Sequence, residues 1–105
     1  MIYWLVLAIG IIFEVLGTIS MKYAEGFTKL TPSILVFVFY GLALASLVVV
    51  LKKMDVSVAY ALWASIGIVI IAIIGMVWFN EPVSWTKIIS ILLIVAGILG
   101  IELFN

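Results

Sequence analysis

Residues 11–20 read IIFEVLGTIS, a run of apolar side chains with one carboxylate, Glu14, near its middle. The apolar run extends over residues 2–21, close to the ~20 residues that a helix needs to cross a hydrocarbon core. An ionisable side chain at this depth is costly, so it usually faces a bundle interior or a wet cavity. The stretch therefore predicts a membrane-spanning helix that carries one acid facing a bundle interior or a wet cavity.

The composition of the whole chain is that of a membrane protein. Of its 105 residues, 69% are hydrophobic and 10% charged, whereas soluble domains are about half apolar and about a quarter charged. The five Lys balance the five acidic residues, so no nucleic-acid partner is indicated. Without Cys or His, and with scattered acids, thiolate chemistry, imidazole catalysis and the usual metal ligands are excluded. We expect no metal, no cofactor, no catalytic residue and no enzymatic activity.

Polar residues divide the chain into apolar segments, and we expect helices over residues 2–21, 32–51, 57–79 and 84–104. Each segment is about as long as a transmembrane helix. Pro32 suits the first turn of the second helix, and Pro82 cannot continue the third. No basic region or small-residue cleavage site marks a signal peptide, so we expect the first span to stay in the mature protein. The predicted fold class is an all-α membrane protein, a single domain of four transmembrane helices.

Glu14 is the only acid or base well inside a predicted span, and two interpretations of it are open. A protonated Glu14 could serve only to hydrogen-bond a neighbouring helix. Alternatively, because burial disfavours its charge and no basic residue shares its depth, a deprotonated Glu14 would take up either a proton or an external cation. A carboxylate that takes one or the other is sufficient for proton–cation exchange. In a dimer, two copies would face one cavity and titrate together.

The residues at helical spacing from Glu14 predict a pocket. Gly10 and Gly17 leave space on either side of the carboxylate, and Thr18 offers a hydroxyl on the same face. Small side chains and a hydroxyl beside an acid would leave room for a bound ligand.

Aromatic residues at membrane depth would suit organic cations, through cation–π attraction of ~0.5–2 kcal/mol per contact. The candidates are Tyr40 in the second segment and Tyr60 and Trp63, three residues apart, in the third. Because Tyr and Trp are also enriched at membrane interfaces, Tyr60 fits either role by depth. The aromatics that we interpret as interfacial anchors are Tyr3, Trp4, Trp78 and Trp85.

Four short helices are too few to enclose a large substrate path, which favours an oligomer. In the fourth segment Ser90 and Gly97 lie seven residues apart, nearly on one helical face. Small residues let helix backbones approach closely in lipid, so this face is a candidate dimer interface.

The lysines give almost no orientation signal, although loop charge normally sets the direction of insertion. Lys22, Lys29 and Lys87 fall on one side of the membrane, against Lys52 and Lys53 on the other. Either orientation is weakly controlled, or the chain inserts both ways and opposite copies pair.

The chain resembles the small multidrug resistance family. The resemblance rests on FEVLGTISMKYAEGFTKLTPS (13–33), VAYALWASIGIVI (58–70), NEPVSWTKI (80–88) and LLIVAGILG (92–100). It implies a bacterial inner-membrane protein that forms an antiparallel, dual-topology homodimer. It also implies proton-coupled export of small organic cations, with Glu14 as the shared proton and substrate site.

The resemblance extends to other positions of the sequence. It implies that Tyr40, Tyr60 and Trp63 are pocket aromatics, that Gly17 and Thr18 pack beside the acid, that Gly67 lies in a helix-three segment that bends during exchange, and that Ser90 and Gly97 belong to the dimer motif.

The branch of the family follows from Gly17. Guanidinium exporters typically carry Trp there, so the chain looks more like the quaternary-ammonium, polyspecific branch. Ala43 stands where the family often has Ser, which removes a hydroxyl, and Ser65 stands where it often has Gly, which would stiffen the bend.

Two alternative functions are open. One is a narrow guanidinium or polyamine exporter, which in some members functions with an unlike partner subunit. The other is a non-transporting assembly subunit.

Overall fold

The computed structural model describes residues 2–104, and this part of the chain consists of four α-helices and their loops, with no strand. The helices are α1 (Ile2–Ala24), α2 (Leu30–Val50), α3 (Val56–Val77) and α4 (Trp85–Phe104). All four are long and apolar enough to cross a membrane. The predicted all-α, multi-pass membrane fold is confirmed.

The helix ends differ from the expected ones for local reasons. Helix α1 continues past Met21 to Ala24, which places Lys22 in the last turn, where a cation is favourable at the negative end of the helix dipole. Helix α2 begins before Pro32, at Leu30, because proline is tolerated anywhere in a first turn.

Helix α3 stops at Val77, earlier than residue 79, and a left-handed residue follows it. Asn80 has φ 55°, a conformation that Asn adopts more readily than most residues. This turn brings the Glu81 N–H to the Gly75 carbonyl, 3.0 Å away. The glutamate side chain then lies over Gly75, where a Cβ would overlap its carboxylate.

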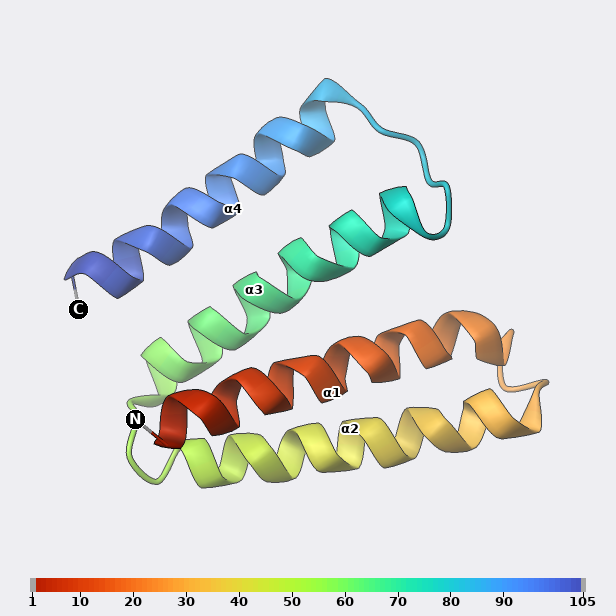
Figure 1. The fold of residues 1–105 in the computed structure, drawn as a ribbon, viewed down its shortest axis with the longest axis horizontal. Coiled ribbons are helices and arrows are strands. Elements are labelled where there is room, and N and C mark those ends of the chain that lie inside the picture. Colours follow the sequence, from red (N-terminus) through yellow and green to blue (C-terminus); the bar gives the residue numbers. More distant parts are fainter. Residues whose placement is uncertain (1, 105) are drawn as a thin grey trace. The chain divides into compact units, whose positions relative to one another are not determined.

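The chain divides into two compact units, Met1–Ala59 and Tyr60–Asn105. In the first unit α1 and α2 run antiparallel and pack side by side (Figure 1). Helix α2 buries Val36, Ala43 and Val50, which are seven residues apart and therefore form one stripe. The buried residues of α1 are Leu7, Gly10, Ile11, Val15, Gly17, Ser20 and Ala24.

The second unit contains most of α3 and all of α4. Ser84 caps α4, since its Oγ accepts the Lys87 N–H at 3.1 Å. The Lys87 ammonium donates to the Pro82 carbonyl at 2.8 Å. None of the residues in the apolar stretch of α4 is buried within the described chain. The organisation of the four helices as one domain stays a prediction.

Candidate functional site

Glu14 lies in the middle of α1 and is half-buried. Gly10 and Gly17, one turn before and one turn after it, are buried. Two positions on the face of α1 that carries the acid therefore have no side chain, and the role of these glycines in a ligand pocket stays a prediction. Within residues 2–104, no three His, Cys, Asp or Glu side chains gather where they could hold a metal ion.

A chain of hydroxyls ties the Glu14 turn to α2. Thr18 Oγ1 donates to the Glu14 carbonyl oxygen at 3.0 Å. The Tyr40 hydroxyl lies 2.6 Å from the same Thr18 Oγ1. Because a threonine hydroxyl has a single hydrogen, already given to the carbonyl, Tyr40 is the donor in this second bond. The Met21 sulfur, 3.7 Å from the Tyr40 hydroxyl, is a weaker acceptor beside it.

Gly17 allows this bond to form. A Cβ at Gly17 would lie 3.2 Å from two ring carbons of Tyr40 and 3.4 Å from Cβ of Phe39. The Tyr40 ring therefore rests directly on the α1 backbone, in the space that a side chain at residue 17 would need. This close approach is the role that small residues play between membrane helices.

An aromatic pair that the sequence analysis missed lies in the same part of α1 and α2. Phe13 and Phe39 are stacked, with ring centroids 6.2 Å apart and an interplanar angle of 24°. Each directly precedes a candidate site residue, Glu14 or Tyr40. Their positions were visible in the sequence, but their pairing depends on how the two helices are rotated. Stacking of this kind helps to fix that rotation.

Ala43 lies on the buried stripe of α2 and is 1% exposed. It supplies no hydroxyl, as the sequence indicated. The hydroxyls that hydrogen-bond to the Glu14 turn, directly or through one another, are those of Thr18 and Tyr40.

Three candidate residues of the second unit, Tyr60, Trp63 and Gly67, lie on α3, which runs without interruption through Gly67. Tyr60 is 58% exposed and Trp63 is 5% exposed. Gly67 is buried, and the Ser65 hydroxyl donates to the Ala61 carbonyl of its own helix. The roles of Tyr60 and Trp63 in the pocket, and of Gly67 in bending, stay predictions.

Ser90 and Gly97 of α4 are both exposed. A Cβ added at Gly97 would meet nothing within 4 Å. Their role in a dimer interface also stays a prediction.

Comparison with known proteins identifies the family. The sequence profile of the Small Multidrug Resistance protein family matches residues 2–94. The chain belongs to the small multidrug resistance family. It is also 52% identical over 102 residues to the "Uncharacterized membrane protein YvaE" of Bacillus subtilis (strain 168). This alignment covers 97% of this chain and 86% of the relative.

Membership confirms the resemblance stated from the sequence motifs. Proteins of the small multidrug resistance family are membrane-embedded oligomers that transport small substrates, so the chain is assigned to small-molecule efflux. The predicted multi-pass location in the bacterial inner membrane agrees with the four spans and with the family. The branch within the family stays a prediction.

Proposed function

We propose that the protein is a proton-coupled antiporter that exports small organic cations, quaternary ammonium ions among them, and that proton and substrate compete for Glu14. The observation that carries this proposal is the position of Glu14, a carboxylate in mid-span on a helical turn that Thr18 and Tyr40 tie to the neighbouring helix. A group held in this way can be presented repeatedly to ligands in one geometry.

Exchange follows from the chemistry of one carboxylate. With the cation bound, Glu14 is charged and balances the ligand. With the proton bound, it is neutral and releases the ligand, because an unpaired cation is costly at membrane depth. Since the site holds either the cation or the proton but not both, the two ligands cross the membrane in opposite directions. Inward movement of protons down their gradient therefore drives export of the cation.

The contact between Gly17 and Tyr40 supports the polyspecific branch. Because the tyrosine ring occupies the space beside residue 17, a tryptophan there would force that ring to move. The family's guanidinium exporters typically carry that tryptophan, so the pocket wall of this chain has a different construction. An aromatic wall suits organic cations that spread their charge over alkyl groups.

The proposal includes an antiparallel homodimer, in which two copies of Glu14 share one cavity. Helix α4 supports it, because none of the residues in its apolar stretch is buried within the described chain and because Ser90 and Gly97 are small, exposed residues that allow a second helix to approach closely. Bending of α3 at Gly67 would open the cavity to alternate sides.

The test is transport by purified protein in proteoliposomes. Addition of tetrapropylammonium outside should move protons across the membrane in the wild type, and Glu14→Gln should abolish this exchange while leaving the helices intact. Gln keeps the size and hydrogen-bonding capacity of the side chain but cannot ionise. Glu14→Asp should stay active with a shifted pH dependence.

Glu102→Gln is the matched control, since it removes an exposed acid near the end of α4 and should exchange normally. If Glu14→Gln still accumulated cation against a proton gradient, the shared-site mechanism would be wrong. A panel of guanidinium, tetrapropylammonium, benzalkonium and spermidine tests the branch. Response to guanidinium alone would overturn the polyspecific assignment, and no exchange with any cation would favour a non-transporting subunit.

A further inference from the structure

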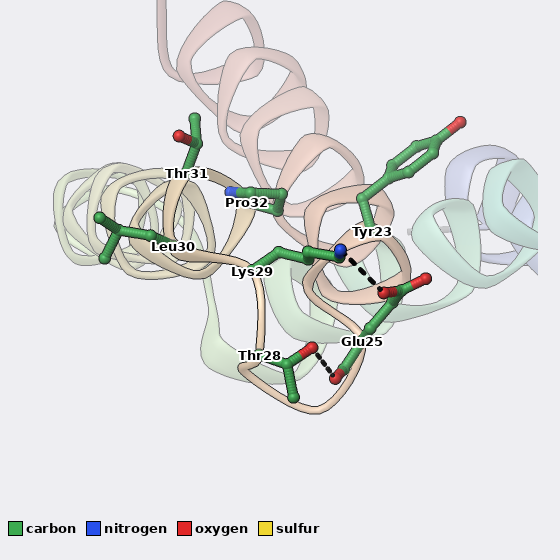
Figure 2. Close-up of a pocket in the computed structure, with 7 residues that line it drawn as sticks. All are labelled: Tyr23, Glu25, Thr28, Lys29, Leu30, Thr31 and Pro32. Atoms are coloured by element: carbon green, nitrogen blue, oxygen red, sulfur yellow. Dashed lines mark hydrogen bonds and ion pairs between the residues drawn. The ribbon is translucent and has the colours of Figure 1, made fainter.

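A pocket of about 600 Å³ lies at the end of the α1–α2 hairpin (Figure 2). It is lined by Tyr23 of α1, by Glu25, Thr28 and Lys29 of the connecting loop, and by residues 30–32 of α2. Because α1 and α2 are both membrane spans that end at this loop, the pocket lies at the level of the lipid head groups.

The loop has a defined shape. Glu25, Gly26 and Phe27 have φ of 47°, 69° and 67°, three successive left-handed residues of which only the glycine adopts that conformation readily. The loop is closed by the N–H groups of Thr28 and Lys29, which donate to the Ala24 carbonyl at 2.9 and 3.2 Å. The pocket wall is therefore built from bonds local to the hairpin.

The wall of the pocket carries one charge of each sign. Lys29 Nζ lies 3.8 Å from Glu25 Oε2, and the two side chains are 61% and 65% exposed (Figure 2). An ion pair this exposed contributes little to stability. Its two ends can therefore separate to bind a ligand that itself carries an anion and a cation a few bonds apart.

An exposed apolar stripe begins at the same pocket and continues along α2. Leu30, in the pocket wall, is 77% exposed, and Ile34 and Phe37 below it are 53% and 70% exposed. These residues are spaced i, i+4 and i+7, so they share one helical face. Gly41 continues the stripe, and nothing lies within 4 Å of a Cβ built on it, so the surface is notched there.

Phe27 of the loop extends the apolar surface at its upper end. Its ring stacks on that of Phe37, with centroids 5.9 Å apart, although both side chains remain more than half exposed. The stack joins the charged loop to the stripe, so that polar and apolar binding surfaces are continuous.

We propose that the pocket binds the head group of an aminophospholipid, a phosphate ester with a primary ammonium, and that one acyl chain lies along the α2 stripe. Lys29 binds the phosphate, because it directly precedes Leu30, where the stripe begins. Glu25 binds the ammonium, whose N–H groups hydrogen-bond a carboxylate in a way that a quaternary choline cannot. This site is independent of the proposed transport function.

The test is competition between two lipids with identical acyl chains, one with an ethanolamine and one with a glycerol head group, followed by native mass spectrometry of the purified protein. The wild type should retain the ethanolamine lipid in preference, by up to about fivefold, the upper end of the range expected of exposed charge pairs. The double variant Glu25→Gln, Lys29→Gln should lose the preference. Helicity by circular dichroism checks that the variants are folded.

The matched control is Lys52→Gln with Asp55→Asn, which removes one exposed charge of each sign from the α2–α3 loop and should keep the preference. Equal retention of both lipids by the wild type, or an equal loss in this control, would overturn the proposal.

Two further experiments distinguish binding of the head group from binding of the acyl chain. Phe37→Ala should lower retention of both lipids without changing their ratio, and unchanged retention would overturn the placement of the acyl chain. Free phosphoethanolamine should displace the lipid poorly; displacement at equal concentration would show that the ligand is the soluble head group rather than a lipid.

Discussion

The Tyr40 hydroxyl lies 2.6 Å from Thr18 Oγ1, and Thr18 in turn donates to the Glu14 carbonyl at 3.0 Å. This links α2 to the backbone turn that carries the acid, without using the carboxylate itself. Movement of Tyr40 would therefore be transmitted to the backbone of Glu14 through these two hydrogen bonds. The relationship gives the α1–α2 pair a defined rotation at the depth of the site.

Removal of this link should cost a small amount of stability that depends on both residues. In a double-mutant cycle, Thr18→Ala and Tyr40→Phe should show a coupling of about 0.6 kcal/mol, the average for hydrogen bonds between membrane helices. The measurement is unfolding in mixed micelles. The control is Ser20→Ala combined with Tyr40→Phe. This pair should show no coupling, because the Ser20 hydroxyl donates to the Leu16 carbonyl of its own helix. Additive effects of Thr18→Ala and Tyr40→Phe would show that the bond contributes nothing.

Gly17 and Gly41 allow a matched test of close packing. In Gly17→Ala the new Cβ would lie 3.2 Å from the Tyr40 ring, so the ring must move, whereas Gly41→Ala meets nothing within 4 Å. Overpacking costs ~1–3 kcal/mol, and alanine is favoured over glycine in a helix by up to ~1 kcal/mol. Gly41→Ala should therefore be neutral or stabilising in micelle unfolding, with Gly17→Ala less stable than it by about 1–3 kcal/mol.

The same pair should differ in function. Displacement of the Tyr40 ring in Gly17→Ala should change the affinity for bulky cations, while Gly41→Ala should bind as the wild type does. Equal stability and equal binding of the two variants would contradict the close contact between Gly17 and Tyr40.

Hydropathy was enough to predict the four spans, because each is a long apolar run and the segments between the runs contain charged residues, Pro or Asn. The ends were less accessible. Nothing in the sequence AEGFT indicates that Glu25 and Phe27 would adopt left-handed φ, since neither residue type favours it. The loop pocket was missed for this reason, although Glu25 and Lys29 have the spacing of an ion pair.

The candidate site was only partly accessible from the sequence. Helical periodicity placed Gly10, Gly17 and Thr18 on the face of Glu14, and both glycines are buried in α1. Periodicity within one helix cannot say which residues of a second helix it meets. The contact of Tyr40 with Thr18 depends on helix rotation, which in lipid is set by packing and hydrogen bonding rather than by hydrophobicity.

Competition at Glu14 should make cation binding depend on pH. As pH falls and Glu14 takes up a proton, the site loses the charge that balances the cation, so the apparent affinity for tetrapropylammonium should fall. As pH rises, affinity should increase until Glu14 is fully ionised and then level off. Isothermal titration calorimetry across a pH series measures this, and proton release on binding should be largest where affinity changes most. Affinity that stayed constant from acidic to alkaline pH would contradict competition.

Loop charge should leave the chain free to insert in both directions. Lys22, Lys29 and Lys87 lie at one set of helix ends, and Lys52 and Lys53 at the other, so the bias is a single charge. Because positive charge near short loops sets orientation, so small a bias should fail to select one. C-terminal reporter fusions should then give signal from both faces of the membrane.

Lysines added to one side of the chain should make transport depend on coexpression of a copy with the opposite orientation. Two Lys added at the C-terminus should draw most chains into one orientation, since late charges can flip a topology. Such a variant should transport poorly when expressed alone, because a dimer of inverted copies needs both orientations for its two similar openings. Coexpression with a variant biased the other way, by Lys added to the α1–α2 loop, should restore transport, whereas two variants biased in the same direction should not. If unmodified chains reported one face only and still transported without a partner, the antiparallel dimer would not apply to this protein.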